Sequence, residues 1–435
     1  MTFFRWQRLL SLVSVGLLAV FFAQSVAYGA VHVVQEGDDL QAILNSAQPG
    51  DTVQLSSGEF EGQFVVEVDG ITLTGPEDFS AIINGTRKGR ALWVKSADVT
   101  VRNLTVTNSG LSLPEMDAAI FLDQGADRAV VENNQLLDNL VGVYVWGPDN
   151  ALVNANYITG NQELRMSERG NGVTIWNSPG SHIVNNQIQF GRDGIFTNYS
   201  KQNTFSGNTF KNLRYGVHYM YTNDSEVSDN ISIDNDIGYA IMFSDRIKAL
   251  GNISLNSRDQ GIMMNYANHS TVEGNSVYQA EKCVYFYNAN INQIHNNHFE
   301  QCEIGIHYTG AAQGNVIYDN AFVYNQTQVK YVGTRYEDWS HEGRGNYWSD
   351  HSGFDLDGDG ISDSAYRPND IIDQVVWRAP SSRILLNSPA VAVVRWAQSQ
   401  FPALLPGGLM DSTPIMKMPE SISYKKLQEL LHERQ

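Results

Sequence analysis

The chain has 435 residues and carries 29 lysines and arginines against 47 aspartates and glutamates, which gives a formal net charge of −18. This balance excludes a protein that binds nucleic-acid phosphates, because such binding requires a basic face, and it suits cations. Two cysteines do not make a disulfide framework. The state of Cys283 and Cys302 therefore stays open between a disulfide and two small buried thiols.

The first segment predicts export. Arg5 and Arg8 precede an apolar run from Leu9 to Ala23, and Ser25-Val-Ala27 has the small-x-small form of a cleavage site. We interpret residues 1–27 as a signal peptide and expect a mature chain outside the cytoplasm. The alternative is an uncleaved anchor, but the apolar run is shorter than the roughly 20 residues that a membrane span needs.

A strand and a short helix should open the mature chain. Val31 to Val34 is a predicted strand, and Asp38 to Ala47 predicts a helix behind an aspartate cap. One face of this helix carries its apolar residues, Leu40, Ile43, Leu44 and Ala47. Such a helix would cover the open end of a stack of strands, where unpaired edges invite aggregation. Residues 52–108 then hold irregular strand runs that look like early coils.

From Asn134 to Asn320 the sequence repeats itself every 22 or 23 residues, with one longer step. The first marker is an asparagine at the end of a short polar turn, at positions 134, 156, 186, 208, 230, 252, 275, 297 and 320. The second marker opens an apolar run in phase with the first, at Gly142, Gly172, Gly194, Gly216, Gly238, Gly261, Cys283 and Gly305. Polar residues 163–170 account for the longer step and are expected to form a loop. This period predicts a solenoid, in which each repeat buries its apolar face against its neighbours.

The repeats read as strands, because their apolar residues alternate and their turns hold Asn, Asp, Gly and Ser. We expect an all-β fold, a parallel β-helix over residues 28–335 with an N-terminal helical cap. The asparagine column has a structural explanation: asparagine tolerates the left-handed conformation of tight turns, and amides in register can form a hydrogen-bonded ladder. We prefer this explanation to a binding role.

Alternation also defines an outward face. Counted from each marker glycine, positions +1 and +3 are apolar and point inward, so +2 and +4 point outward. Three consecutive coils then direct His218, Met220, Met242 and Met263 at one patch. Imidazole and thioether groups suit Cu(I) and are poor ligands for Mg²⁺, Ca²⁺ or Mn²⁺, so the patch is a candidate site for transiently bound copper. The alternative is a strip that a loop or partner covers, with methionine filling gaps.

Outward aromatic residues allow a second hypothesis. Tyr144, Trp146, Trp176 and Phe196 lie on the same face and could stack sugars, as in an exported polysaccharide lyase or epimerase. Such an enzyme needs a catalytic base and a stabilising partner, and Arg192, Asp193 and the turn aspartates form no obvious set of this kind. We therefore expect no enzymatic activity.

An acidic loop follows the repeats within residues 336–388. Asp355, Asp357, Asp359 and Asp363 occupy loop positions 1, 3, 5 and 9, with glycine at position 6, a spacing that places oxygen ligands around Ca²⁺. Tyr366 replaces the bidentate glutamate of an EF-hand, so the loop is closer to other short DxDxDG calcium loops. We expect a structural calcium ion here, and the alternative is an acidic turn without metal.

The final segment, residues 389–435, predicts a helical tail. Two short helices are expected at 389–400 and 421–432, separated by prolines and glycines. The second places Tyr424, Leu427, Leu430 and Leu431 along one stripe. Either helix could cap the far end of the solenoid or dock on a partner, and the sequence does not choose.

Three segments resemble the NosD family of periplasmic nitrous oxide reductase maturation proteins: residues 191–200 (GRDGIFTNYS), 214–225 (RYGVHYMYTNDS) and 346–360 (NYWSDHSGFDLDGDG). The 389–402 segment also resembles the family's tail. The resemblance implies a right-handed β-helix in the periplasm. It also implies partners: the permease and ATPase of an ABC transporter, a lipoprotein copper chaperone, and nitrous oxide reductase, whose copper centres it would help to build through copper or sulfur supply. It assigns no copper ligands, and the His218 to Met263 patch is inferred from the residues alone.

Overall fold

The computed structural model describes residues 29–434, except residues 310, 334, 370, 386–387 and 401–407. The predicted signal peptide, residues 1–27, therefore lies outside the described residues. No helix in the described part is long and apolar enough to cross a bilayer.

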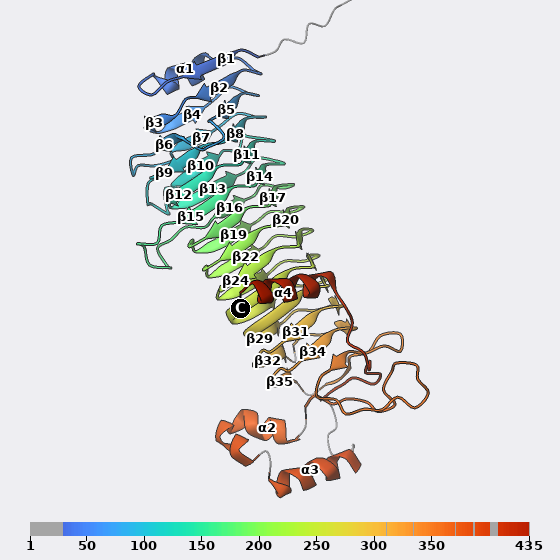
Figure 1. The fold of residues 1–435 in the computed structure, drawn as a ribbon. Helices are drawn as coiled ribbons and strands as arrows, with labels where there is room; N and C mark the ends of the chain where they lie inside the picture. Colours follow the sequence, from blue (N-terminus) through green and yellow to red (C-terminus); the bar gives the residue numbers. More distant parts are fainter. Residues whose placement is uncertain are drawn as a thin grey trace, which may run out of the picture.

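The described chain winds into a parallel β-solenoid, which confirms the all-β solenoid predicted from the period (Figure 1). Each coil contributes up to three short strands, and each strand pairs in parallel with its counterparts in the neighbouring coils. The first row is β1 (Val31–Val34), β2 (Thr52–Leu55), β5 (Thr72–Thr74), β8 (Thr100–Arg102), β11 (Val130–Glu132), β14 (Leu152–Asn154), β17 (His182–Val184), β20 (Thr204–Ser206), β23 (Glu226–Ser228), β26 (Lys248–Leu250), β28 (Thr271–Glu273), β30 (Gln293–His295) and β33 (Val316–Tyr318).

The other two rows merge into one sheet. The second row follows the asparagine turn and is β3 (Gly58–Glu61), β6 (Ala81–Asn84), β9 (Thr105–Thr107), β12 (Gln135–Asn139), β15 (Tyr157–Gly160), β18 (Gln187–Gln189), β21 (Thr209–Lys211), β24 (Ile231–Ile233), β27 (Ile253–Asn265), β29 (Ser276–Tyr287), β31 (His298–Glu300), β34 (Ala321–Val323) and β37 (Tyr347–Trp348). The third row is β4 (Phe64–Val66), β7 (Leu92–Val94), β10 (Ala118–Leu122), β13 (Val141–Trp146), β16 (Val173–Trp176), β19 (Asp193–Asn198), β22 (Tyr215–Met220), β25 (Ile237–Met242), the second halves of β27 and β29, β32 (Ile304–Thr309) and β35 (Thr327–Val332). The long strands β27 and β29 pair in both rows, which joins the rows into one sheet.

An amide ladder connects the coils at the turn between the first and second rows. The side chain of each repeat asparagine donates from Nδ2 to Oδ1 of the next, at 2.9–3.0 Å, from Asn134 through Asn320 to Asn346. The ladder part of the prediction is confirmed. The left-handed part was wrong by one residue, because positive φ occurs at the preceding position, for example at Asp229 before Asn230. The ladder asparagines are needed for their amides, while the residue before them makes the turn.

Both ends of the solenoid are covered. At the N-terminal end, α1 (Leu40–Ser46) is capped by Asp39, whose side chain accepts from the Ala42 N–H, and it buries Leu40 and Leu44 against the first coil, as predicted (Figure 1). At the other end, Asn346 adds a rung to the ladder and donates to Asp411 Oδ2 at 3.2 Å, so part of the 336–388 segment belongs to the last coil. The strand pair β36 (Tyr336–Asp338) and β38 (Gly408–Met410) lies beside it.

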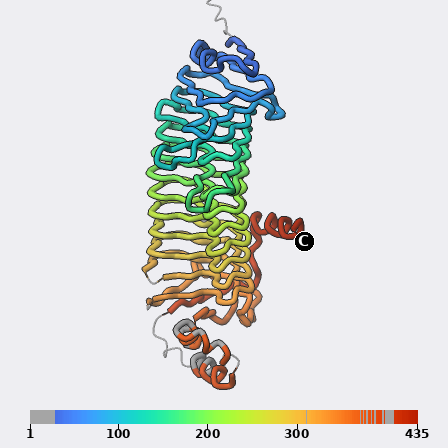
Figure 2. Tube along the Cα trace, turned by 90° about the vertical axis from the view of Figure 1, so that its left-hand side faces the viewer, coloured from blue at the N-terminus to red at the C-terminus, as the bar shows by residue number. Residues whose placement is uncertain are grey.

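The helices of the C-terminal tail lie in two different places. α2 (Ile371–Arg378), the 3-10 helix η1 (Pro380–Leu385) and α3 (Pro389–Gln400) lie beyond β35, past the end of the coils (Figure 1). The last helix, α4 (Ile422–Glu433), instead returns to the flank of the solenoid beside the middle coils (Figures 1 and 2). Its predicted stripe packs there, with Leu427 fully buried against Ile253 and Leu255. α4 therefore covers the side of the stack, which neither of the two sequence alternatives described.

Cys283 and Cys302 form a disulfide. The interpretation as two free thiols was therefore wrong. Cys283 takes the place of the marker glycine in its coil, and Cys302 lies before the marker of the next coil. Stacking of neighbouring coils brings these offset positions to a Cα–Cα separation of 5.7 Å, within the usual range for a disulfide.

Candidate functional site

The third row of strands carries the candidate copper patch on its outer side. Its +1 and +3 side chains, such as Val217 and Tyr219, are fully buried in the solenoid core, so the +2 and +4 side chains face outward. The register aligns His218 with Ala240 and Met263, and it aligns Met220 with Met242 and Asn265. Neighbouring strands are about 4.8 Å apart. The four predicted residues thus occupy two adjacent columns on three consecutive coils, as the sequence indicated.

The side chains of the patch are more buried than those on the solvated face of a sheet. His218 and Met263 are each 7% exposed, while Met220 and Met242 are half-buried. Met242 and Met263 belong to an apolar cluster of their own, separate from the solenoid core, together with Ile237, Ala240, Tyr215 and Tyr285. Aromatic neighbours on the same face provide the cover, since the rings of Phe196 and Tyr215 lie 5.0 Å from the His218 ring.

A buried ion pair orients His218. Its Nδ1 lies 3.1 Å from Asp193 Oδ2, and Arg214 donates two hydrogen bonds to the same carboxylate at 2.6 and 2.8 Å. Burial acts to raise the pKa of Asp193, but the hydrogen bonds from His218 and Arg214 outweigh it, and the pKa is lowered. An ionised Asp193 can only accept, so the His218 Nδ1–H donates to it and Nε2 is the ring nitrogen left to bind a metal. Carboxylate-bound imidazoles of this kind are the usual form of a metal-ligating histidine.

The Nε2 atom of His218 is buried and has no hydrogen-bond partner. Other buried polar atoms without partners lie on the outer side of the third row of strands, which we call the outer strip. They are Asn198 Oδ1, Gln260 Oε1, Asn265 Oδ1, His307 Nδ1 and Thr309 Oγ1. Within the described residues, six of the nine such atoms lie on this strip. Because buried polar atoms are normally hydrogen-bonded, the concentration makes this strip the candidate site of the described residues.

The sequence did not assign the role of Asp193. Asp193 was considered only as a catalytic residue, whereas it supports His218 from the preceding coil. The signal was present in the period, because Asp193 stands one place before its marker glycine and aligns with Tyr215, three residues before His218. What the period could not give is the direction in which the carboxylate points.

The acidic loop brings three of its four predicted ligands together. Oxygen atoms of Asp355, Asp357 and Asp359 lie within 4.8 Å of one another. Asp363 instead accepts a hydrogen bond from the Leu356 N–H at 2.7 Å. Hydrogen bonds from the N–H groups of Gly360 and Gly358 lower the pKa of Asp355, which keeps this carboxylate ionised. Exposed oxygen atoms in this arrangement fit a hard cation.

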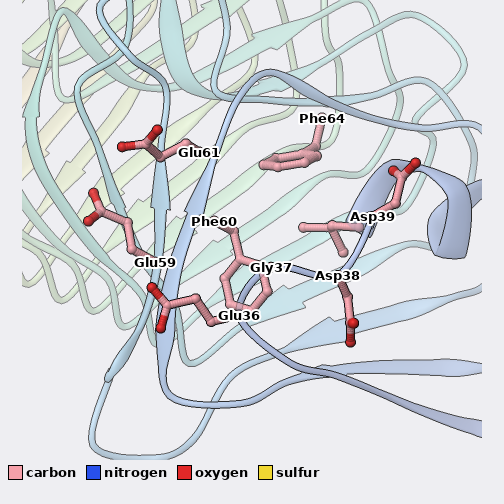
Figure 3. A pocket seen from close by; sticks show the side chains of 9 residues that line it. Glu36, Gly37, Asp38, Asp39, Glu59, Phe60, Glu61 and Phe64 are labelled. Carbon is pink, nitrogen blue, oxygen red and sulfur yellow. The ribbon is translucent and has the colours of Figure 1, made fainter.

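A hollow at the N-terminal end is also acidic (Figure 3). Its volume is about 460 Å³, and its carboxylates surround the rings of Phe60 and Phe64. Asp39 is occupied as the cap of α1, and Glu59 accepts from Asn84. The lining of this hollow contains no histidine or methionine, so the hollow is not a candidate Cu(I) site.

Comparison with known proteins gives a consistent picture. Residues 154–353 match the family described as "Periplasmic copper-binding protein (NosD)". Two proteins named "Probable ABC transporter binding protein NosD" are each 38% identical to this chain. The one from Stutzerimonas stutzeri aligns over 381 residues, 84% of this chain and 87% of its own length. The one from Pseudomonas aeruginosa aligns over 379 residues, 84% of this chain and 88% of its own.

Solved structures share the fold at low identity. A family 28 exopolygalacturonase of Yersinia enterocolitica aligns with a TM-score of 0.54 and 10% identity, covering 70% of this chain and 78% of that one. The Dettilon tailspike protein aligns with a TM-score of 0.51 and 14% identity, covering 70% and 69%. At such identities the likeness concerns the β-solenoid alone.

Proposed function

Because this chain belongs to the NosD family, we propose that it is a non-enzymatic assembly factor of the periplasm. It works beside the permease and ATPase of an ABC transporter, receives copper from a lipoprotein chaperone, and helps to build the copper centres of nitrous oxide reductase. The description of the family supports the periplasm and copper, and the names of the two relatives support an ABC transporter. That nitrous oxide reductase is the client is the part of the proposal that goes beyond these descriptions.

One observation carries the copper part of the proposal. The Nε2 atom of His218 is buried without a partner, while Asp193 holds the other ring nitrogen. Three thioethers share its patch on adjacent coils. Such neutral, soft ligands suit Cu(I) as cargo rather than a permanently bound ion. A half-covered site on an outer wall also leaves room for release to a partner.

We expect His218→Ala combined with Met220→Ala and Met242→Ala to lower the Cu(I) affinity of the purified mature chain by more than about 100-fold. Outer partners of metal ligands alone are worth roughly 10–100-fold, and this variant removes three ligands. Competition with a chromogenic Cu(I) chelator measures the affinity. Met416→Ala with His182→Ala is the matched control, because both residues are exposed and lie outside the patch.

Equal Cu(I) affinity in the triple variant and the control would show that this patch does not bind copper. The role itself is tested in cells that lack the gene. Wild-type protein should restore nitrous oxide reduction, and the triple variant should not. Cleavage or epimerisation of a uronate polymer by the purified protein would replace the assembly role with the enzyme hypothesis.

We also propose a structural Ca²⁺ ion in the acidic loop, held by Asp355, Asp357 and Asp359, with Asp363 shaping the loop through its bond to Leu356. Positive φ angles of 76° and 87° at Gly358 and Gly360 let the loop curl around these carboxylates. Removing Ca²⁺ with a chelator should lower the melting temperature of wild type by several degrees. Asp357→Asn with Asp359→Asn should lose both the calcium content and the response to chelator. An unchanged melting curve and no bound calcium in wild type would contradict the site.

A further inference from the structure

A column of aromatic rings runs beside the candidate copper patch, at the corner that follows the third row. Tyr199, Tyr221, Phe243 and Tyr266 stack in consecutive coils, with centroids 5.0–5.2 Å apart and planes within 22°. Trp176 and Tyr287 contact the two ends of this stack at 5.4 and 5.8 Å. We call these six residues the aromatic stripe. Five of them are 38–56% exposed, and Phe243 is half-buried.

The backbone of the stripe is unusual for such residues. The four stacked residues have φ between 47° and 51°, in the left-handed region. In the flanking coils the same corner is occupied by Asn177 and Asn288, at φ 47° and 50°. Asparagine adopts this conformation readily, whereas bulky side chains there are outliers. Bulky residues outside the stripe, such as Phe190 and Tyr324, also have a left-handed backbone, so the continuous stack of exposed rings, and not the backbone alone, distinguishes this column.

The exposed surface of the stripe excludes two kinds of ligand. Sugars bind aromatic side chains by stacking on ring faces, but in the four stacked residues neighbouring rings occupy the faces, which leaves mainly ring edges exposed. An anionic membrane surface attracts basic clusters, whereas the turns that follow the stripe residues carry only two basic residues, Lys201 and Arg246, and Arg246 is paired with Asp224. An exposed row of tyrosine and tryptophan side chains is instead typical of a protein interface, where these residues are enriched.

The position of the stripe identifies the partner. Tyr221 directly follows Met220, and Phe243 directly follows Met242, so a protein seated on the stripe also reaches the thioether column. His218, the ligand supported by Asp193, lies one column further away. A Cu(I) ion arriving from the stripe side would meet weak thioethers first and the imidazole last, which is the order for a metal being received.

We infer that the aromatic stripe is the docking surface for the protein that donates Cu(I) to this chain. This inference rests on the proposed function, because it presumes that the His218 patch binds copper. The donor presents an apolar rim to the stripe and its metal to Met220 and Met242.

The test replaces Tyr199, Tyr221, Phe243 and Tyr266 together by asparagine, the residue that the column itself uses in flanking coils. We expect the mature protein to keep its melting temperature within a few degrees and its Cu(I) affinity within about twofold. The rate of Cu(I) transfer from the soluble domain of the lipoprotein chaperone should fall at least tenfold, as measured by stopped-flow mixing with the loaded donor. Tyr324→Asn is the matched control, because Tyr324 also has a left-handed backbone, φ 51°, and is 73% exposed outside the stripe. Its transfer rate should equal that of wild type.

The outcomes separate the two levels of inference. If wild type binds no Cu(I), the proposed function fails. If both proteins bind Cu(I) equally and the fourfold variant accepts it at the wild-type rate, the docking surface is wrong while the copper site stands. Binding of alginate oligosaccharides or of anionic vesicles that the asparagine variant loses would also overturn the inference, in favour of a sugar or lipid surface.

Discussion

Replacing Asn252 by alanine should destabilise the solenoid by about 3–6 kcal/mol, since two donors and two acceptors each lose a hydrogen bond and a buried polar group left without a partner costs roughly 1–3 kcal/mol. Asn252 is 1% exposed and sits in the middle of the amide ladder. Its Oδ1 accepts from the side chain and backbone of Asn230 at 3.0 and 3.1 Å, and its Nδ2 donates to the Val227 carbonyl at 2.8 Å and to Asn275 Oδ1 at 2.9 Å. Alanine removes these bonds without providing a route for water to replace them.

Urea unfolding of the mature chain measures this effect, with calcium held constant. Asn256→Gly is the control, because Asn256 is exposed and keeps φ 58°, which glycine adopts without strain. Its stability should change by less than about 1 kcal/mol, the usual range for surface positions. A loss at Asn252 no larger than that at Asn256 would mean that the ladder contributes little and that apolar stacking alone holds the coils together.

The repeat length predicted most of the fold because it reflects a geometric requirement. Each coil must return the chain to the same place about 4.8 Å further along the axis, so residues that perform the same task recur in phase. Asn134 to Asn320 and the inward +1 and +3 positions could be identified for this reason. The continuation of the ladder to Asn346 was not foreseen, because the step to it is longer and its coil lacks the glycine marker.

Features that depend on contacts between distant segments could not be predicted. α4 was expected as a helix with an apolar stripe, yet its location on the flank follows from Ile233, Ile253 and Leu255. Together with Leu427 of α4 they form a buried apolar cluster on the outer side of the second row. Likewise, the period placed His218 beside the methionines but did not reveal its bond to Asp193. Register specifies which residues are neighbours, whereas the side-chain torsions that decide a hydrogen bond leave no repeating signal.

Replacing Asp193 by asparagine should lower both stability and copper affinity. Asp193 is 1% exposed and accepts from Arg214 and His218. Breaking a buried ion pair costs about 3–5 kcal/mol, and the lower end applies here because the Arg214 side chain is 27% exposed. Loss of the group that orients the imidazole should also weaken Cu(I) binding by about 10–100-fold.

Acid should erase the stability difference between this variant and wild type. The folded-state pKa of Asp193 lies below its ordinary value of 3.8, so the ionised carboxylate stabilises the fold at neutral pH. This contribution is fully present above the unfolded-state pKa and is lost as the pH falls through the folded-state pKa. Unfolding curves of the two proteins should therefore differ at pH 7, and the difference should shrink as the pH falls below about 4 and vanish below the folded-state pKa of Asp193.

Asp236→Asn provides the control for both effects. Asp236 pairs with Arg258, but its side chain is 39% exposed and that of Arg258 is 55% exposed. Surface pairs of this kind are worth about 0–1 kcal/mol, and this one lies outside the copper patch. If Asp193→Asn and Asp236→Asn bind Cu(I) with the same affinity, Asp193 does not orient a copper ligand. A stability loss at Asp193 without any change in copper affinity would leave the Asp193, Arg214 and His218 group as a structural brace between two coils.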